Sequence, residues 1–546
     1  MIQPAKPIFP PELSSPPGLS VATVRLLAPD AVKAMLGDRQ EVALVDLREE
    51  LIYSQNHLLW ARSIPLSRLE LKFARLVPRL NTRIVLVDDA DGLAERAVRT
   101  LARAKYTNLH VLKGGVAAWA AAGYELFSGV NVPSKAFGEH VEHSYETPSV
   151  SAEELNALIA KGMDLVVLDS RPFDEYQRIS IPTATNVPGA ELVLRVHDLA
   201  PSPETLVVVN CAGRTRSIIG AQSLINAGVP NKVVALRNGT MGWSLAGFSC
   251  EKDKQRRAPK VSGKSLARAK SAAEQVARRF GIARIDRAML NRWRSEENER
   301  TLYVFDVRDP AEYEAGHVAG AISAPGGQLV QATDQYVGTL GARIVLVDDS
   351  EVRAVMTASW LRQMGWKDVF VLVQAGTEKG WPAAHTIGTP PRAETAMDSA
   401  DLLKELANEN ATIIDLSLSR EYRKGHIAGA WFAIRSRHAQ SIGKIAPRGK
   451  VVLTSDDGLL AGLAVAEVRK LTKFPVCYLK GCNAAWKAAG YPLSTDARMA
   501  DEAVDAWLKP YERTGDTKGA MSEYLAWETD LLPRIARDGT CTFVKA

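Results

Sequence analysis

The sequence predicts an α/β protein of four tandem domains, each a parallel sheet flanked by helices, followed by a helical C-terminal tail. The first observation is self-similarity, because four short apolar runs end in Asp and each is followed about 70 residues later by a Trp. The four pairs are Asp46 and Trp119, Asp169 and Trp243, Asp306 and Trp381, and Asp415 and Trp486, separated by 73, 74, 75 and 71 residues. The second observation is that apolar runs without period-2 alternation are separated by amphipathic stretches. This pattern indicates strands that are buried on both faces of a parallel sheet, with helices between them.

Each repeat contains three apolar runs that we expect to be strands. In the first repeat they read ALVD, RIVLVDD and HVLKGG, and the other repeats have equivalents in the same order. Helices are expected between the strands. In the second repeat, Ser151 and Glu154 have the spacing of a capping box at the start of an amphipathic stretch. Ala-rich segments such as 92–104 and 217–228 follow the second run and are typical of helices packed on a sheet.

We expect the chain to be organised in seven segments. They are a flexible N-terminal arm (1–19), domain 1 (20–130), domain 2 (131–250), a basic linker and helix (251–282), domain 3 (283–390), domain 4 (391–496) and a helical tail (497–546). Each domain spans about 110 residues, enough for its own hydrophobic core. The tail is interpreted as packing material for a neighbouring domain rather than as a catalytic element.

Composition and charge argue against two classes of partner. The 546 residues are 46% hydrophobic and 24% charged, which is typical of a globular protein, and no apolar stretch approaches the ~18 residues of a membrane span. The net charge is +6, and the segment 251–270 alone holds eight Lys or Arg and two acids. Such a run is more typical of a solvated linker than of a nucleic-acid-binding face. We therefore expect neither nucleic acid nor a membrane as partner.

The five cysteines fit neither a disulfide framework nor a metal site. Their number is odd, and no CxxC motif or Cys/His cluster has zinc-site spacing. The first residues lack the basic-then-apolar pattern of a signal peptide, and no GxGxxG or Walker motif suggests a nucleotide cofactor. The expected compartment is the cytoplasm, and neither a metal nor another cofactor is expected.

The end of the second apolar run distinguishes one repeat from the other three. In open parallel sheets, ligands bind at the carboxyl ends of strands, in the loop that leads to the next helix. At this point we interpret the first, third and fourth repeats as carrying Asp89, Asp349 and Asp456, whereas the second repeat carries Cys211. Cys211 is therefore the candidate catalytic nucleophile.

The residues after Cys211 favour a thiolate, which is the nucleophilic form of cysteine. Backbone N–H groups of the loop and the dipole of the following helix add partial positive charge, and two arginines add full charges. A buried structural cysteine is the alternative, but the polar sequence AGRTRS makes poor core chemistry. The residues of the loop that we expect to bind an anionic substrate are Ala212, Gly213, Arg214, Thr215 and Arg216.

Several motifs together carry a family resemblance. They are Asp-x-Arg (Asp46/Arg48, Asp169/Arg171 and Asp306/Arg308), the segments 312–321 and 421–430, and a Gly-x4-Trp ending. The repeats resemble rhodanese domains, and residues 20–496 are similar to a multidomain rhodanese sulfurtransferase of the thiosulfate type. Two positions depart from the pattern: Ser417 replaces the Arg in the fourth repeat, and Ser180 stands where later repeats have His317 and His426.

The resemblance implies a persulfide mechanism. A single loop cysteine accepts a sulfane sulfur from thiosulfate or a related donor and passes it to cyanide or a thiol, and the three repeats without this cysteine are inactive. It also implies that Arg171 contributes to substrate binding; the alternative for Arg171 is a structural pair with Asp169 or Glu175. The expected partners are a small anionic sulfur donor and a thiol or cyanide acceptor. The oligomeric state stays open, with a homodimer as one option.

Two other functions stay open at the level of sequence. Because three repeats lack the cysteine, the chain could be a non-catalytic scaffold or a sulfur-relay protein. A Cys-based phosphatase or an arsenate reductase on the same fold is the further alternative. The phosphatases that share this fold have five residues between Cys and Arg, whereas four separate Cys211 from Arg216. The shorter loop suits a sulfur centre better than a tetrahedral phosphate.

Overall fold

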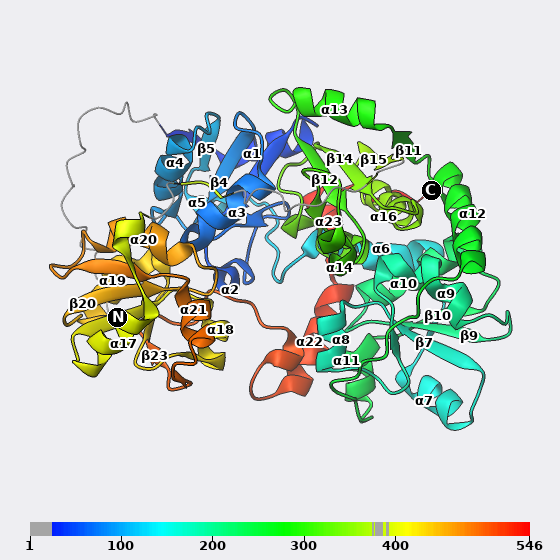
Figure 1. The fold of residues 1–546 in the computed structure, drawn as a ribbon. Helices are drawn as coiled ribbons and strands as arrows, with labels where there is room; N and C mark the ends of the chain where they lie inside the picture. The colour runs from blue at the N-terminus through cyan, green and yellow to red at the C-terminus, as the bar shows by residue number, and fades with distance from the viewer. Residues whose placement is uncertain (1–23, 374–375, 377–385, 389–391, 546) are drawn as a thin grey trace, which may run out of the picture.

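The computed structural model describes residues 24–373, 376, 386–388 and 392–545. It contains four α/β domains and a C-terminal tail (Figure 1), and the predicted fold class is confirmed, since each domain is built on a parallel sheet. The predicted N-terminal arm (1–19) and Trp381 lie outside the described residues. Within the described part of the chain, no helix is long and apolar enough to cross a membrane.

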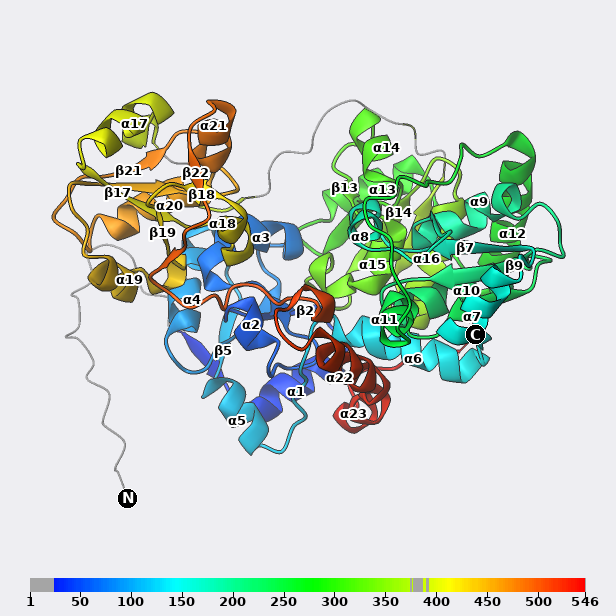
Figure 2. The same ribbon diagram turned by 90° about the horizontal axis from the view of Figure 1, so that it is seen from below.

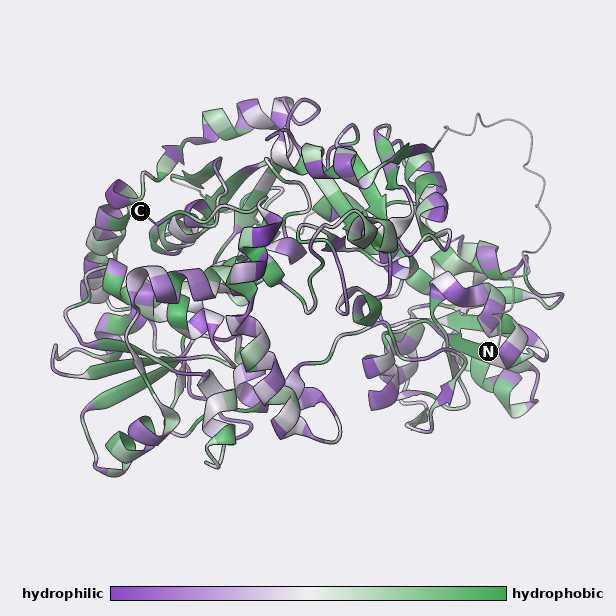
Figure 3. Cartoon of the chain, turned by 180° about the vertical axis from the view of Figure 1, so that it is seen from behind, coloured by the Kyte–Doolittle hydropathy of each residue, from purple (hydrophilic) through white to green (hydrophobic). Residues whose placement is uncertain are grey.

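Domain 1 shows the arrangement that the other domains repeat. Its strand β2 (Val42–Asp46) is buried along its whole length and pairs in parallel with its neighbours, in the sheet order β1-β5-β4-β2-β3. Helices on both faces explain why the apolar runs do not alternate, and Figure 3 shows hydrophobic strands inside each domain. The other elements are β1 (Arg25–Leu27), α1 (Pro29–Gly37), α2 (Glu50–Tyr53), β3 (Arg62–Ser63), α3 (Leu69–Leu76), β4 (Arg83–Val87), α4 (Leu93–Arg103), β5 (Leu109–Leu112) and α5 (Gly115–Ala121).

Domain 2 has the same topology, with the sheet order β6-β10-β9-β7-β8. It begins with an additional helix, α6 (Val132–Tyr145), which packs along α10. The capping box predicted at Ser151 and Glu154 is present at the start of α7. The elements are β6 (Ser149–Val150), α7 (Ala152–Ala160), β7 (Leu165–Asp169), α8 (Phe173–Arg178), β8 (Thr185–Asn186), α9 (Leu192–Leu199), β9 (Leu206–Asn210), α10 (Thr215–Asn226), β10 (Val233–Leu236) and α11 (Gly239–Leu245).

The basic segment that follows domain 2 is only partly solvated. Its backbone runs along the edge of domain 2, where the Ser180 N–H donates to the Glu251 carbonyl oxygen at 2.9 Å. Helix α12 (Gly263–Arg279) then lies between α9 of domain 2 and α16 of domain 3 and buries one face there, including Ala269, Ala273 and Val276. The segment therefore joins the two domains by packing as well as by covalent connection.

Domain 3 has the sheet order β11-β15-β14-β12-β13. It shares one continuous hydrophobic core with domain 2 and α12. Its elements are β11 (Ala283–Ile285), α13 (Arg287–Ser295), β12 (Leu302–Asp306), α14 (Pro310–Ala315), β13 (Ile322–Ser323), α15 (Gly326–Gln331), β14 (Arg343–Val347), α16 (Val352–Gln363) and β15 (Val369–Leu372).

Domain 4 adds strands to the common plan. Its main sheet has the order β16-β21-β20-β17-β19-β23, and β18 pairs with β22. The elements are β16 (Ala396–Met397), α17 (Ser399–Ala407), β17 (Ala411–Asp415), α18 (Ser419–Lys424), β18 (His426–Ile427), β19 (Trp431–Phe432), α19 (His438–Ile445), β20 (Lys450–Thr454), α20 (Leu460–Val468), β21 (Val476–Leu479), α21 (Cys482–Ala488), β22 (Leu493–Ser494) and β23 (Arg498–Met499).

The tail returns across the molecule from domain 4 to domain 2. Domains 1 and 4 form one half of the structure, domains 2 and 3 form the other, and domain 1 contacts domain 3 between them (Figure 1). The tail helices α22 (Thr517–Thr529) and α23 (Leu531–Asp538) pack on α6, and α22 also contacts α11. Figure 2 shows this red segment between the two halves. The tail therefore reaches the domain that carries Cys211.

Candidate active site

Cys211 begins the loop between β9 and α10. Its side chain is buried, and its Sγ lies 3.5 Å from the hydroxyl oxygen of Ser217 in the first turn of α10. The backbone of α11 closes over the loop, because the Thr240 N–H donates to the Cys211 carbonyl oxygen at 2.8 Å. A Cβ at Gly239 would lie only 2.3 Å from that oxygen, and its φ is +55°. Only glycine fits at this position without strain.

The sheet register identifies the true counterparts of Cys211 in the other domains. Asn210, which precedes Cys211, lies opposite Asp169. The residues opposite the equivalent aspartates of domains 1, 3 and 4 are Val87, Val347 and Thr454. The counterparts of Cys211 are therefore Asp88, Asp348 and Ser455. The prediction that named Asp89, Asp349 and Asp456 was wrong by one residue, because adjacent acids in the sequence do not show where strand pairing ends.

The loops without cysteine show that this position binds negative charge. In domain 1, the buried carboxylate of Asp88 accepts hydrogen bonds from the N–H groups of Ala90 and Ala94, both at 2.9 Å. In domain 3, Asp348 accepts from the Arg353 N–H at 2.8 Å. Loop N–H groups at a helix start form a concave site for an anion. In domain 2 the sulfur of Cys211 takes the position that a carboxylate has in domains 1 and 3.

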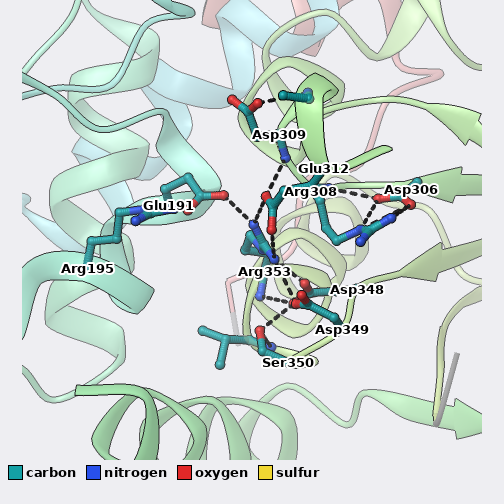
Figure 4. A network of polar contacts seen from close by, with 12 residues as sticks. Glu191, Arg195, Asp306, Arg308, Asp309, Glu312, Asp348, Asp349, Ser350 and Arg353 are labelled. Atoms are coloured by element: carbon teal, nitrogen blue, oxygen red, sulfur yellow. Dashed lines mark hydrogen bonds and ion pairs between the residues drawn. The ribbon is translucent and has the colours of Figure 1, made fainter. Parts of the chain in front are cut away.

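The loop of domain 3 is filled by its own side chains. The buried guanidinium of Arg353 contacts Asp348 at 2.9 Å, Asp349 at 2.8 Å and Glu312 at 2.6 Å (Figure 4). It also contacts Glu191 of domain 2 at 2.7 Å. This network fastens domain 3 to domain 2 and pairs the loop carboxylates of domain 3 with a cation of the same chain.

The two loop arginines are held in different surroundings. Arg214 lines the pocket around Cys211, but Glu139 of α6 binds its guanidinium through two contacts of 2.7 Å, and Glu142 binds it as well. Arg216 donates to Glu175 at 2.9 Å and to Gln328 of domain 3 at 2.9 Å. Arg214 is therefore directed towards α6, whereas Arg216 spans the interface between two domains.

Glu175 brings a second cation to the pocket. Lys509 of the tail lies 3.0 Å from Oε1 of Glu175, whose Oε2 accepts a hydrogen bond from Arg216 at 2.9 Å. Burial alone would raise the pKa of Glu175, but Arg216 and Lys509 lower it overall. Burial and the charge of Arg216 lower the pKa of Lys509. Two cations share one carboxylate, so this side of the pocket keeps one uncompensated positive charge.

Arg171 is a fully buried partner of Asp169. Its guanidinium donates to the Asp169 carboxylate at 2.8 and 2.6 Å and to the Ile179 carbonyl oxygen at 2.6 Å. Its Nη1 has no hydrogen-bond partner among the described residues. In domain 1 the equivalent nitrogen of Arg48 binds Asp89 at 3.0 Å, and the counterpart of Asp89 in domain 2 is Ala212. The structure thus shows the structural pair and also leaves one donor unused beside the loop.

The pocket around Cys211 has a volume of about 250 Å³. It is lined by residues of the segment 130–135, of the rest of domain 2, of domain 3 and of the tail. The predicted residues Ala212, Gly213, Arg214, Thr215 and Arg216 all line it. The Thr215 hydroxyl donates to Glu528 of the tail at 3.4 Å. The lining residues that sequence reasoning missed are Gln328, Gln331 and Gln335 of domain 3 and Trp507, Lys509, Tyr511 and Tyr524 of the tail. No local sequence signal marks them, because only inter-domain packing brings them to Cys211.

Comparisons with known proteins agree with this architecture. The family described as rhodanese-like domain matches residues 28–122, 151–246, 288–379 and 398–489. A crystal structure of a thiosulfate sulfurtransferase from Pseudomonas aeruginosa is 47% identical in sequence, with a TM-score of 0.92, and the match covers 95% of this chain and 99% of that chain. A Bacillus subtilis (strain 168) protein named as a sulfur carrier protein, YrkF, is 24% identical over 182 residues, which is 30% of this chain and 97% of that protein.

These matches define the class of protein. The four family matches span most of the chain and coincide with the four α/β domains of the structure. The chain therefore belongs to the rhodanese family, as a multidomain enzyme with one cysteine-bearing loop.

Proposed function

We propose that this chain is a sulfurtransferase that takes a sulfane sulfur from thiosulfate, or a related anionic donor, onto Cys211 and delivers it to cyanide or a thiol. One observation carries the proposal: Cys211 occupies a position where the equivalent loops of domains 1 and 3 hold a carboxylate with backbone N–H groups. A site that stabilises a carboxylate also stabilises a thiolate, which is the attacking species.

The first half of the cycle transfers sulfur to the enzyme. The Cys211 thiolate attacks the outer sulfur of thiosulfate, a new S–S bond forms, and sulfite leaves with the electron pair of the broken S–S bond. Arg216, Lys509 and the loop N–H groups would stabilise the charge on the departing sulfite. Arg171 does not line the pocket; its buried Nη1, which has no hydrogen-bond partner among the described residues, is the remaining candidate contact.

The second half returns the enzyme to its starting state. Cyanide, or the thiolate of an acceptor, attacks the outer sulfur of the Cys211 persulfide, and Cys211 leaves as a thiolate with the electron pair. The products are thiocyanate or an acceptor persulfide. Mercaptopyruvate is an alternative donor, but the surplus positive charge beside Glu175 favours a compact dianion.

The alternative functions have less support from the geometry. A scaffold has no use for a nucleophile in a pocket of about 250 Å³. A phosphatase is disfavoured by the length of the loop, because only four residues separate Cys211 from Arg216, whereas the phosphatases that share this fold have five.

Intact-mass measurement of the full chain tests the proposal. Incubation with thiosulfate should add the mass of one sulfur atom, and cyanide should remove it. Cys211→Ser should remain at its starting mass with thiosulfate, because serine cannot hold a persulfide. Cys250→Ser, at a half-buried cysteine outside the loop, is the matched control and should gain the sulfur. If Cys211→Ser still gains the mass of one sulfur atom from thiosulfate, the assignment of Cys211 is wrong.

A further inference from the structure

A second cavity lies between domain 1, domain 4 and the tail. Its volume is about 650 Å³, which falls within the ~300–1,000 Å³ typical of small-molecule sites. Domain 1 contributes Leu51 and Ser54, and domain 4 contributes Arg420 and Arg423 from α18. The remaining wall is formed mainly by the tail. We call this cavity the inter-domain cleft.

The charge of the inter-domain cleft favours an anion. Its lining contains three arginines, Arg420, Arg423 and Arg513, and one carboxylate, Glu523. Arg420 pairs with Glu421 at 3.4 Å, but the other two arginines still outnumber the one carboxylate of the lining. In the described part of the chain, Arg423 and Arg513 form no ion pair, and Arg513 donates to the Leu508 carbonyl oxygen at 3.3 Å. Guanidinium groups of this kind bind carboxylates through paired hydrogen bonds.

The aromatic wall of the inter-domain cleft favours an organic anion over a bare inorganic one. Trp507, Tyr524 and Trp527 follow one another along the tail side, with ring centroids 6.1 and 5.3 Å apart. Arg513 lies over the ring of Trp507 at 6.0 Å. A wall of this kind contacts the apolar part of a ligand while the arginines bind its charged ends.

The inter-domain cleft adjoins the pocket of Cys211. Trp507 and Tyr524 line both cavities. Lys509, two residues beyond Trp507, contacts Glu175 in the Cys211 pocket. The two cavities therefore meet at the side chains of Trp507 and Tyr524.

We infer that the inter-domain cleft is the acceptor site and that it takes a carboxylate-bearing thiol of the size of a short peptide. The inference rests on the proposed function, since it concerns the second half of the same cycle. The acceptor thiol loses its proton to solvent, and its thiolate attacks the outer sulfur of the Cys211 persulfide. The S–S bond breaks, Cys211 leaves with the electron pair, and the acceptor becomes a persulfide. Domain 4, which has no cysteine in its loop, then acts by supplying arginines to the acceptor.

The test compares a charged and a neutral thiol as acceptors for the full chain with thiosulfate as donor. The probes are glutathione, which carries carboxylates, and 2-mercaptoethanol, which does not. The measured quantity is the ratio of kcat/KM for glutathione to kcat/KM for 2-mercaptoethanol. Arg423→Ala and Arg513→Ala should each lower this ratio by about fivefold, the upper range for an exposed ion pair, and the double variant should lower it further.

The matched control is Lys424→Ala. Lys424 is exposed on the same helix as Arg423, but it pairs with Glu421 and does not line the inter-domain cleft. This variant should keep the ratio of the unmodified chain. S-methylglutathione, which cannot accept sulfur, should compete with glutathione.

The outcomes separate the two proposals. An unchanged ratio in the double variant, or S-methylglutathione that does not compete with glutathione, would overturn the acceptor site and leave the proposed function intact. If thiosulfate adds no sulfur to Cys211 in the unmodified chain, the proposed function itself fails, and the acceptor site fails with it.

Discussion

One position in the loop distinguishes domain 2 most clearly from the other three domains. The residue that follows the strand paired with the Asp-bearing strand is Cys211 in domain 2 and Asp88, Asp348 or Ser455 in the others. Loop N–H groups and a helix start stabilise negative charge whichever atom carries it. Backbone N–H groups bind a carboxylate in domains 1 and 3, and we propose that in domain 2 they stabilise the thiolate of Cys211.

Arg216 should matter more for a charged donor than for a neutral one. Arg216→Ala should lower kcat/KM for thiosulfate by about tenfold to a hundredfold, because a charged hydrogen bond contributes ~1.5–3 kcal/mol. The same substitution should lower kcat/KM much less for a dialkyl trisulfide, which is an uncharged sulfane donor. Arg216→Lys should restore activity only in part if the paired geometry of the guanidinium is used.

Arg214→Ala is the matched comparison for this prediction. Arg214 is bound by Glu139 and Glu142, so its removal leaves the buried carboxylate of Glu139 without this partner and should lower the unfolding temperature. Its effect on kcat/KM should be similar for the two donors. If Arg216→Ala also affects both donors equally, Arg216 has a structural role and does not bind the donor anion.

At the scale of elements, the sequence predicted what local patterns determine. Apolar runs and helical stretches are local, so the four sheets and the loop of Cys211 could be predicted. Strand register depends on pairing with another strand. The predicted acids, Asp89 and Asp349, were therefore one residue beyond the true counterparts, Asp88 and Asp348. The pocket itself depends on packing between distant segments. Gln328 and Lys509 lie 117 and 298 residues beyond Cys211 in sequence, and no pattern near either residue points to the loop.

The tail should contribute to donor binding through Lys509. Lys509→Met keeps the length of the side chain but leaves Glu175 to neutralise Arg216 alone. The surplus positive charge disappears, and we expect the KM for thiosulfate to rise by about tenfold, as for one charged hydrogen bond. Lys518→Met, at an exposed position of α22, is the control and should keep the original KM.

The pH dependence of thiosulfate use gives a second measurement of the same contribution. Burial and Arg216 lower the pKa of Lys509. As the pH is raised, Lys509 therefore loses its proton, and with it its positive charge, at a lower pH than an ordinary lysine, whose pKa is ~10.4. The KM for thiosulfate should therefore rise as pH increases through this lowered pKa, and Lys509→Met should remove that rise. The same alkaline rise in Lys509→Met would show that another group titrates.

At the scale of the whole molecule, the two halves differ in the interactions that hold their two domains together. Domains 2 and 3 share one continuous hydrophobic core, which holds the pocket between them rigid. Domains 1 and 4 keep separate cores, although apolar side chains of domain 1 such as Leu71 pack on domain 4. Polar contacts between them include Arg435 with Glu70 at 2.7 and 2.8 Å and Ser436 with Glu49 at 2.9 Å. Polar interfaces respond to pH, so domain 4 should be the part whose attachment depends most on protonation.

Glu49 is the group that should set this dependence. It is buried where domains 1 and 4 meet and accepts hydrogen bonds from Ser67 and Ser436, and burial raises its pKa to about 7. An unfolded chain titrates glutamate at about 4.3. The folded protein therefore holds this proton more tightly, and the resulting stability is fully present below about pH 4.3 and is lost as pH rises through about 7.

Glu49→Gln should remove this pH dependence. The rise in the pKa of Glu49 to about 7 corresponds to roughly 3 kcal/mol of the free energy of unfolding, and glutamine keeps the shape of the protonated side chain without ionising. Urea unfolding between about pH 5 and about pH 8 should show the unmodified chain losing stability relative to Glu49→Gln as pH rises. Other titrating groups, such as the buried His57 and His438, contribute equally to both proteins and cancel in the difference. Parallel stability curves for the two proteins would mean that Glu49 is already ionised in the folded state, and that the contact between domains 1 and 4 tolerates its charge.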